Sequence, residues 1–469
     1  MRRPDARRPL TLLEKATLAH VGVLLLCASW VFGGNIWWAR IALSIWASLS
    51  VGLTAAAFLQ SGDRGRDVRR KAWWLLPLLL FSALVIASTL NPSFRPISIE
   101  GETQLVHRGA ARPDWPSTAN PEQTLRAWWF GAGVYLSAFN LVIILRRRSA
   151  LCGLLVLIAA NTLVLAVFGT LQKLMGLGFY FGAATSPNPR FFATFIYYNH
   201  WGAFMILSLT TAAGLLFYFA RSYEGRNLWH TPFSGALMGV LFIAISAPVS
   251  ASRAATVLAA LVVAVATAHA LLRIATLRRA SRRPVWPAIL LLLALVGSAT
   301  GAAGWLALRS IDERYTETRA ALAQDQSLFT GRLELYRDTW ELAKRQPVFG
   351  WGLDSYGTAF QLIRPHSIRY RDRYEHSYVN AHCDWLQSLA ETGFTGTFLL
   401  ILMGALPLYG MSAAAFRKPL VGYPLLGCMI VLFYAWIEFP FGNAAVMITF
   451  WILLFTAIRL AQLSPITTR

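Results

Sequence analysis

A series of apolar runs, each about 20 residues long, constrains the fold of this chain more than any other feature of its sequence. A run of that length can cross the hydrocarbon core of a bilayer as one α-helix. Of the 469 residues, 56% are hydrophobic and only 14% are charged, so the apolar surface is too large for one soluble core. The sequence therefore predicts an all-α fold, a polytopic membrane helix bundle.

The apolar runs number about twelve by this measure of length and hydropathy. We expect one membrane domain over residues 1–469. The predicted transmembrane helices cover residues 16–33, 37–60, 72–90, 126–145, 150–171, 199–220, 233–250, 254–273, 286–308, 394–413, 420–438 and 443–461.

Basic residues gather at the ends of the apolar runs, and the formal net charge is +21. In a soluble protein this charge would indicate a nucleic-acid partner. Short arginine-rich connections between apolar spans instead mark the cytoplasmic side of a membrane protein. We expect contact with membrane lipids, no nucleic-acid partner, and both chain termini in the cytoplasm. The clusters are Arg2, Arg3, Arg7 and Arg8; Arg64, Arg66, Arg69, Arg70 and Lys71; Arg146, Arg147 and Arg148; Arg278, Arg279, Arg282 and Arg283.

Three longer segments fall on the opposite, outer side: residues 91–125, 172–198 and 309–393. Residues 91–125 carry several prolines and mixed charges, which predicts an irregular loop. Residues 309–393 form the largest outer loop and are partly helical, because CDWLQSLAETG predicts a short helix that ends at Gly393. The run GRLELYRDTWELAKRQP predicts an amphipathic helix on the membrane face. Its apolar positions at helical spacing are Leu333, Tyr336, Trp340 and Ala343.

Two arginines lie on the outer side, away from the cytoplasmic clusters. Arg253 stands in APVSASRAATV between two apolar runs, and Arg190 precedes the aromatic segment FFATFIYYNH. A guanidinium forms bidentate, charge-assisted hydrogen bonds with phosphate oxygens, so both are candidates for holding a phosphate. The alternative for Arg253 is an ordinary interfacial arginine that reaches the lipid headgroups. The aromatic neighbours typical of an interface belt are Phe191, Phe192, Tyr197 and Tyr198.

Three histidines of the largest outer loop, His366, His376 and His382, are candidates for a general base. An unperturbed imidazole has a pKa of about 6.5, which suits it to accept a proton from a hydroxyl near neutral pH. The residues alone do not choose among the three. The outer segments contain no Asp-x-Asp pair and no HExxH motif, so the sequence predicts no metal site, and arginines would have to hold any diphosphate.

Four patterns follow one another along the chain. They are R-x-x-[GA]-x-F-x-x-x-N in RFFATFIYYNH, S-x-S-R in SASR, W-x-x-A-x-x-x-P-x-x-G-x-G in WELAKRQPVFGWG, and A-H-x-x-x-L-x-x-x-x-E-x-G in AHCDWLQSLAETG. In this order, with a long outer loop before the tenth span, they resemble the O-antigen ligase and polymerase family of bacterial membrane glycosyltransferases. The resemblance covers residues 150–450.

The resemblance implies a glycosyltransferase without metal or cofactor, at the periplasmic face of the bacterial inner membrane. The donor would be a glycan on undecaprenyl diphosphate, and the acceptor lipid A-core or a growing polysaccharide. Arg190 and Arg253 would hold the diphosphate, and His382 would be the base that acts on the acceptor hydroxyl. Because the hydroxyl would attack opposite the leaving group, we expect inversion of the anomeric carbon. The further predicted substrate-binding residues are Asn199, Asp384 and Glu391.

Two positions depart from the family pattern. Ala193 stands where a glycine is common, and Cys383 stands where an asparagine is usual, which leaves the identity of the acceptor open. A ligase, a polymerase and a protein O-oligosaccharyltransferase share donor and chemistry, and the sequence does not separate them. A transporter or lipid flippase is the alternative from another class. Acidic residues are nearly absent from the spans, with Glu438 at a helix end, whereas transporters carry buried ionisable groups.

Overall fold

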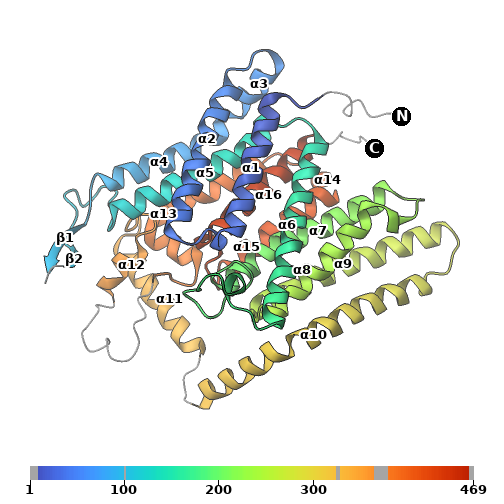
Figure 1. The fold of residues 1–469 in the computed structure, drawn as a ribbon. Helices are drawn as coiled ribbons and strands as arrows, with labels where there is room; N and C mark the ends of the chain where they lie inside the picture. Colours follow the sequence, from blue (N-terminus) through green and yellow to red (C-terminus); the bar gives the residue numbers. More distant parts are fainter. Residues whose placement is uncertain (1–8, 100–101, 324–327, 364–378, 464–469) are drawn as a thin grey trace.

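The structure is a computed structural model that describes residues 9–99, 102–323, 328–363 and 379–463. Helices make up most of these residues, and the predicted all-α membrane fold is confirmed (Figure 1). The helices are α1 (Leu12–Trp30), η2 (Phe32–Gly34), α2 (Trp37–Phe58), α3 (Gly62–Lys71), η3 (Ala72–Leu75), α4 (Leu76–Thr89), α5 (Pro121–Ile144), α6 (Arg148–Leu174), η4 (Phe179–Gly182), α7 (Tyr198–Ser222), η5 (Leu228–His230), α8 (Pro232–Val249), α9 (Arg253–Ala280), α10 (Trp286–Ala323), α11 (Leu328–Arg345), α12 (Tyr356–Ala359), η6 (Phe360–Leu362), α13 (Asp384–Leu408), α14 (Ala413–Phe416), α15 (Pro419–Tyr434), η8 (Pro440–Gly442) and α16 (Ala444–Gln462).

Within the described chain, eleven helical segments are long and apolar enough to cross a membrane. They coincide with eleven of the predicted runs, and the remaining run, at residues 420–438, contains the shorter apolar helix α15. This helix ends at Tyr434, and the chain then turns through Glu438 into η8. The span predicted at residues 420–438 is therefore short because its outer end is a loop that carries a carboxylate.

The helices α5, α7 and α16 are the most buried of the spans, whereas α9 and α10 present most of their surface outward. Small residues permit close approach between the inner helices. A Cβ atom at Gly202 in α7 would lie only 2.6 Å from the Cβ of Ala255 in α9. This contact fixes the start of α9 against the start of α7, next to the arginine predicted to hold a phosphate.

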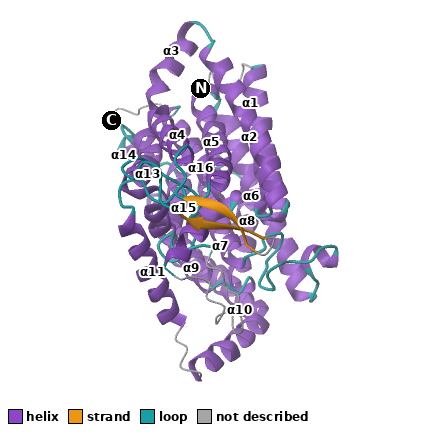
Figure 2. Cartoon of the chain, turned by 90° about the vertical axis from the view of Figure 1, so that its left-hand side faces the viewer, coloured by secondary structure: helices purple, strands orange, loops and turns teal. Residues whose placement is uncertain are grey.

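A two-stranded hairpin replaces part of the irregular loop predicted at residues 91–125, so that prediction was wrong there. Strand β1 (Phe94–Ile99) pairs antiparallel with β2 (Glu102–His107), drawn in orange in Figure 2. The alternating isoleucines of FRPISI and the β-branched Thr103 and Val106 of ETQLVH favour extended, paired backbone. The proline in β1 is compatible with this pairing because a strand of a two-stranded sheet always has one free edge.

A second apolar core, separate from that of the bundle, joins the hairpin to α11, α12 and the start of α13. Trp351 lies within it. Its ring nitrogen donates to Leu342 O at 3.0 Å, and its backbone N–H donates to Ala390 O at 2.9 Å. We call this assembly of the hairpin, α11, α12 and residues 379–393 the outer unit. His382 is part of this unit and is held to α11 through the Tyr336 hydroxyl.

The amphipathic helix predicted at the start of the outer loop exists as α11, but its buried face includes only part of the predicted one: Ala343 is buried, whereas Leu333 and Trp340 are exposed. Leu335, Thr339 and Leu342 are buried in the outer unit, while Leu333 is 62% and Trp340 is 41% exposed. Residues seven apart lie on the same side of a helix. The pair Leu335 and Leu342 therefore fits the helical period as well as the pair Leu333 and Trp340 does. The helix predicted to end at Gly393 is confirmed, because the backbone leaves helical geometry there with φ 62° and ψ −171°.

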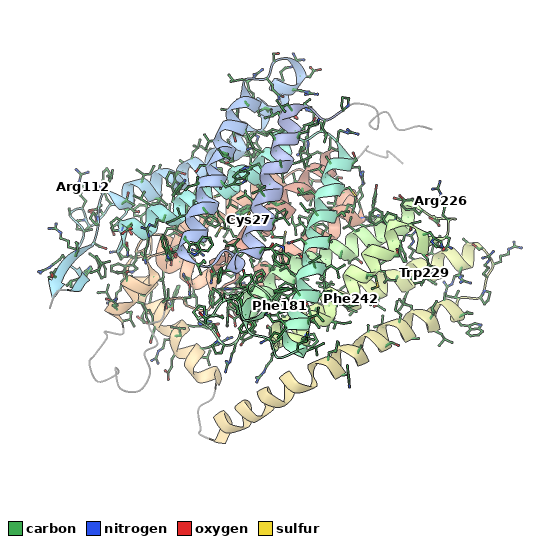
Figure 3. All side chains as sticks on the ribbon, viewed as in Figure 1. Cys27, Arg112, Phe181, Arg226, Trp229 and Phe242 are labelled. Atoms are coloured by element: carbon green, nitrogen blue, oxygen red, sulfur yellow. The ribbon has the colours of Figure 1, made fainter. Side chains whose placement is uncertain are left out.

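In Figure 3, Arg112, beside the hairpin, and Arg226, in the α7–α8 connection, project at opposite sides of the view.

We expect Gly352→Ala to destabilise the outer unit strongly. Gly352 has φ 101°, and a Cβ there would lie 2.0 Å from Thr118 Oγ1 and 2.8 Å from Thr118 Cα. Backbone strain and the clash together should cost more than about 2 kcal/mol. The matched control is Gly410→Ala, with φ 85° but no atom within 4 Å of the added Cβ. Melting of the purified protein in detergent should show a clearly larger fall for the first variant; equal falls would contradict the packing described.

Candidate functional site

A buried carboxylate, Glu438, joins three of the four patterns found in the sequence. Its side chain is only 4% exposed and lies in the loop between α15 and η8. Oε1 accepts hydrogen bonds from Asn199 Nδ2 at 2.8 Å and from Arg332 at 2.7 Å. Oε2 lies 3.5 Å from Nδ1 of His382 and 3.5 Å from the Tyr197 hydroxyl. Residues far apart in the chain therefore meet around one charge.

Local contacts fix the position of His382 at the start of α13. Its backbone adopts φ 51°, and its carbonyl accepts a hydrogen bond from the Tyr336 hydroxyl at 2.9 Å. The ring packs edge-on against Phe439, with 4.7 Å between centroids. Nδ1 is buried, although the side chain as a whole is 33% exposed, so the exposed part is the rest of the ring. The imidazole therefore presents one nitrogen inward and its opposite edge outward.

The N-terminus of α13 is docked onto the loop that carries Glu438. Asp384 N donates to Ala435 O at 2.9 Å, and a carboxylate oxygen of Asp384 accepts from Phe441 N at 2.9 Å. Cys383 is buried and its side chain makes no capping hydrogen bond. Asparagine is among the best N-cap residues, so the amide usual in the family would cap α13 from this position.

Asn199 connects Glu438 to the start of α9. Its Oδ1 accepts from Ser252 Oγ at 2.6 Å, while its Nδ2 donates to both Glu438 and Tyr197. Ser252 is the N-cap of α9, since its Oγ accepts from Ala255 N at 3.3 Å. Arg253 is the first residue of α9 and its side chain is exposed. The second serine of the S-x-S-R pattern thus belongs to the buried network, and the arginine that follows it has an exposed side chain.

Arg190 also has an exposed side chain and a backbone tied to the network. Its carbonyl accepts from Tyr198 N at 3.1 Å, and its N–H donates to Asn188 Oδ1 at 2.8 Å. Between Arg190 and Asn199 the chain makes a tight turn in which Phe192 and Phe195 exchange two backbone hydrogen bonds. Phe192 is fully buried, so the interface belt predicted for it was wrong.

Positive φ values occur at a non-glycine residue in each of the three site segments. They are 51° at Ala193, 60° at Ala251 and 51° at His382. This left-handed region is unfavourable for residues that carry a Cβ atom, by about 1–2 kcal/mol per residue. A glycine, which is common at the position of Ala193 in the family pattern, would adopt this conformation without that cost. Strained backbone of this kind is concentrated at functional sites, where the surrounding contacts hold it in place.

The charge state of the network follows from its contacts. Burial alone would raise the pKa of Glu438, but His382 and Arg332 outweigh it, and the pKa is lowered from its usual value. Burial would lower the pKa of Arg332, yet the adjacent carboxylate raises it. Burial and the charge of Glu438 both raise the pKa of Tyr197. At neutral pH the network therefore contains a carboxylate, a guanidinium and a neutral phenol.

The two carboxylates predicted to bind substrate, Glu391 and Asp384, accept hydrogen bonds from backbone N–H groups of the protein. Glu391 accepts hydrogen bonds from the backbone N–H groups of Asp354 at 2.8 Å and Tyr356 at 3.3 Å. Asp384 accepts from the loop beyond Glu438, as described above. Glu391 holds backbone beside and within α12, Asp384 holds backbone in η8, and the contact of either with substrate stays a prediction. His366 and His376 lie outside the described residues.

Sequence reasoning missed the central role of Glu438 and the contributions of Arg332 and Arg40. Arg40, near the start of α2, donates to the carbonyl of Gly442, four residues beyond Glu438. One signal was available for Glu438, since it is an isolated carboxylate beside spans that hold almost no acidic residues. Arg332 has no comparable signal, because charged residues are common throughout α11.

Among the residues that the structure describes, no group of three or more His, Cys, Asp or Glu side chains has the arrangement of a metal site. The charged groups at this end of the bundle are the arginines, the histidine and the carboxylates already described. Together they can bind an anion and move a proton.

The comparison with curated proteins gives no match. A family model described as O-antigen ligase matches residues 237–401, from within α8 to within α13. The matched segment contains Arg253, α11 and His382, whereas Arg190, Asn199 and Glu438 lie outside it. Over this segment the chain therefore matches the O-antigen ligase family of membrane enzymes.

Proposed function

We propose that the protein transfers a glycan from undecaprenyl diphosphate to a hydroxyl of lipid A-core, with inversion and without a metal ion. Extension of a polysaccharide on its lipid carrier, or glycosylation of a protein side chain, would use the same donor and the same residues. The proposal refines the coarser conclusion from the family domain, which is an enzyme of the O-antigen ligase or polymerase type.

The observation that carries this proposal is the meeting of three sequence patterns at Glu438. Ser252, Asn199 and His382 belong to different patterns, and hydrogen bonds or a close contact join them through one carboxylate. Arg253 directly follows Ser252 in the chain. The carbonyl of Arg190 accepts a hydrogen bond from the N–H of Tyr198, the residue before Asn199. A base and two guanidinium groups can therefore serve one substrate.

In the proposed reaction, His382 accepts the proton of the acceptor hydroxyl through its exposed edge. The hydroxyl oxygen forms a bond to the anomeric carbon, and the bond from that carbon to the diphosphate oxygen breaks. The electron pair leaves with the lipid diphosphate, where negative charge develops. Arg190 and Arg253 stabilise that charge, because fixed cations at a partly dry surface act with little competition from water.

We also propose that the site faces the periplasm of the bacterial inner membrane, with both termini in the cytoplasm. The support is the distribution of arginines, since the short connections on the opposite side carry the basic clusters. A lipid-linked glycan presented at the periplasmic face would reach this side directly. The rival function of a transporter or flippase receives less support, because the outer unit builds a proton-accepting site at one surface.

The proposed function is tested by reconstitution of the purified protein with an undecaprenyl-diphosphate-linked oligosaccharide and lipid A-core. We expect product on lipid A-core, measured by gel mobility, and full activity in EDTA because arginines bind the diphosphate. Lengthened lipid-linked chains without transfer would indicate the polymerase instead. Loss of activity in EDTA that magnesium restores would contradict the metal-free mechanism. Absence of both products from folded protein would point to another acceptor or to transport.

Replacing either outer arginine by alanine should reduce transfer by at least about 100-fold, on the scale of a lost transition-state charge contact. Arg190→Lys and Arg253→Lys should recover little activity, because lysine lacks the bidentate fork. The matched control is Arg126→Ala, an exposed arginine at the start of α5 that pairs with Glu122. Initial rates with saturating acceptor measure the effect. Wild-type rates in either alanine variant would remove that arginine from the site.

His382→Ala should lower the turnover rate about 10²- to 10⁴-fold, the usual contribution of a general base. His366→Ala and His376→Ala should remain within a few-fold of wild type. The comparison uses single-turnover rates with one donor preparation for all three variants. Severe loss in His366→Ala or His376→Ala, with an active His382→Ala protein, would assign the base to a different histidine.

A further inference from the structure

We propose that Glu438 is the positioning residue for the base, orienting His382 with Nδ1 protonated and Nε2 directed to the acceptor hydroxyl. The inference rests on the proposed function and assigns a role to a residue outside the matched family domain. Its basis is the geometry of the buried ring nitrogen and of the carboxylate that faces it.

The buried ring nitrogen of His382, Nδ1, lies close to the carboxylate of Glu438. Nδ1 has no hydrogen-bond partner within the described structure, and the carboxylate oxygen Oε2 of Glu438 lies 3.5 Å away. If Nδ1 carried a lone pair, that lone pair would face an anion. A proton on Nδ1 turns the same contact into an attraction, which tightens when substrate orders the site. The carboxylate thereby selects the tautomer whose Nε2 is free to accept a proton.

The orientation of the Glu438 carboxylate is itself fixed by other elements. Oε1 is occupied by Asn199 from α7 and Arg332 from α11, which directs Oε2 toward the histidine. Arg332 also balances the negative charge, so the carboxylate remains ionised in a buried position. Phe439, the next residue, supports the imidazole by edge-on contact. The ring thus has a fixed plane and a fixed partner.

The assignment has a consequence for proton transfer. When Nε2 takes the acceptor proton, the ring becomes an imidazolium whose Nδ1–H lies against the carboxylate, and the new positive charge is stabilised there. After transfer, the proton leaves Nε2 to water and the neutral tautomer is restored. A base held in place by a third group is the general arrangement of activated nucleophiles and bases.

Glu438→Gln is the decisive substitution, since it keeps the shape and removes the charge. The amide also offers a donor to Nδ1, which favours the opposite tautomer. We expect the turnover rate to fall about 10²- to 10⁴-fold, with the KM for the lipid-linked donor unchanged. In the His382→Ala background the same change should cost less than about threefold, because a residue that acts through the histidine has nothing left to position.

The matched control is Glu122→Gln, which neutralises an exposed, arginine-paired carboxylate at the outer end of α5 and should leave rates unchanged. Equal losses from Glu438→Gln in the wild-type and His382→Ala backgrounds would overturn the proposal. Should Glu438→Gln melt below the assay temperature, Glu438→Asp replaces it. That variant withdraws the carboxylate from His382 by the length of one methylene group, so turnover should fall about 10- to 100-fold; unchanged turnover would overturn the proposal. An inactive wild-type protein would instead refute the proposed function.

Discussion

The outer end of this membrane protein is organised by the need to stabilise one buried negative charge. Removing a carboxylate from water costs several kcal/mol unless opposite charges and hydrogen bonds compensate. Glu438 receives that compensation from Asn199 of α7, Arg332 of α11 and the neighbouring His382. These elements are far apart in the sequence, so the ends of the helices must meet at this point for the charge to be tolerated. The contacts that stabilise Glu438 therefore also bring the residues of the site together.

The charged groups of the site differ in exposure, and the difference matches the role proposed for each. Arg190 and Arg253 have exposed side chains on backbone that is held by the network, while Glu438 is buried within it. A lipid diphosphate must arrive from the membrane and leave after transfer, so the cations that bind it need open access. The orientation of a base must instead persist through every turnover. A buried carboxylate provides that constancy because water does not compete for its hydrogen bonds.

The sequence predicted the membrane bundle because apolar runs of sufficient length have few alternatives to spanning a bilayer. It also placed His382 and Gly393 correctly at the ends of a helix that packs on the outer unit. The hairpin at Phe94–Ile99 and Glu102–His107 escaped prediction, because prolines and charges obscured its short alternation. The contact between Asn199 and Glu438 spans 239 positions in sequence, and no local pattern records such a distance. Burial of Leu335 in place of Leu333 was equally undetermined, since helical period fixes a spacing and leaves the choice of face to tertiary packing.

Backbone strain gives the buried carboxylate a mechanical role as well. Ala193, Ala251 and His382 each hold a left-handed conformation within a site segment, at a cost of about 1–2 kcal/mol apiece. The first two precede Asn199 and Ser252, and all three segments are tied through hydrogen bonds or contacts to Glu438. The contacts of these segments offset the strain, and Glu438 is the group to which all three are tied, directly or through Asn199.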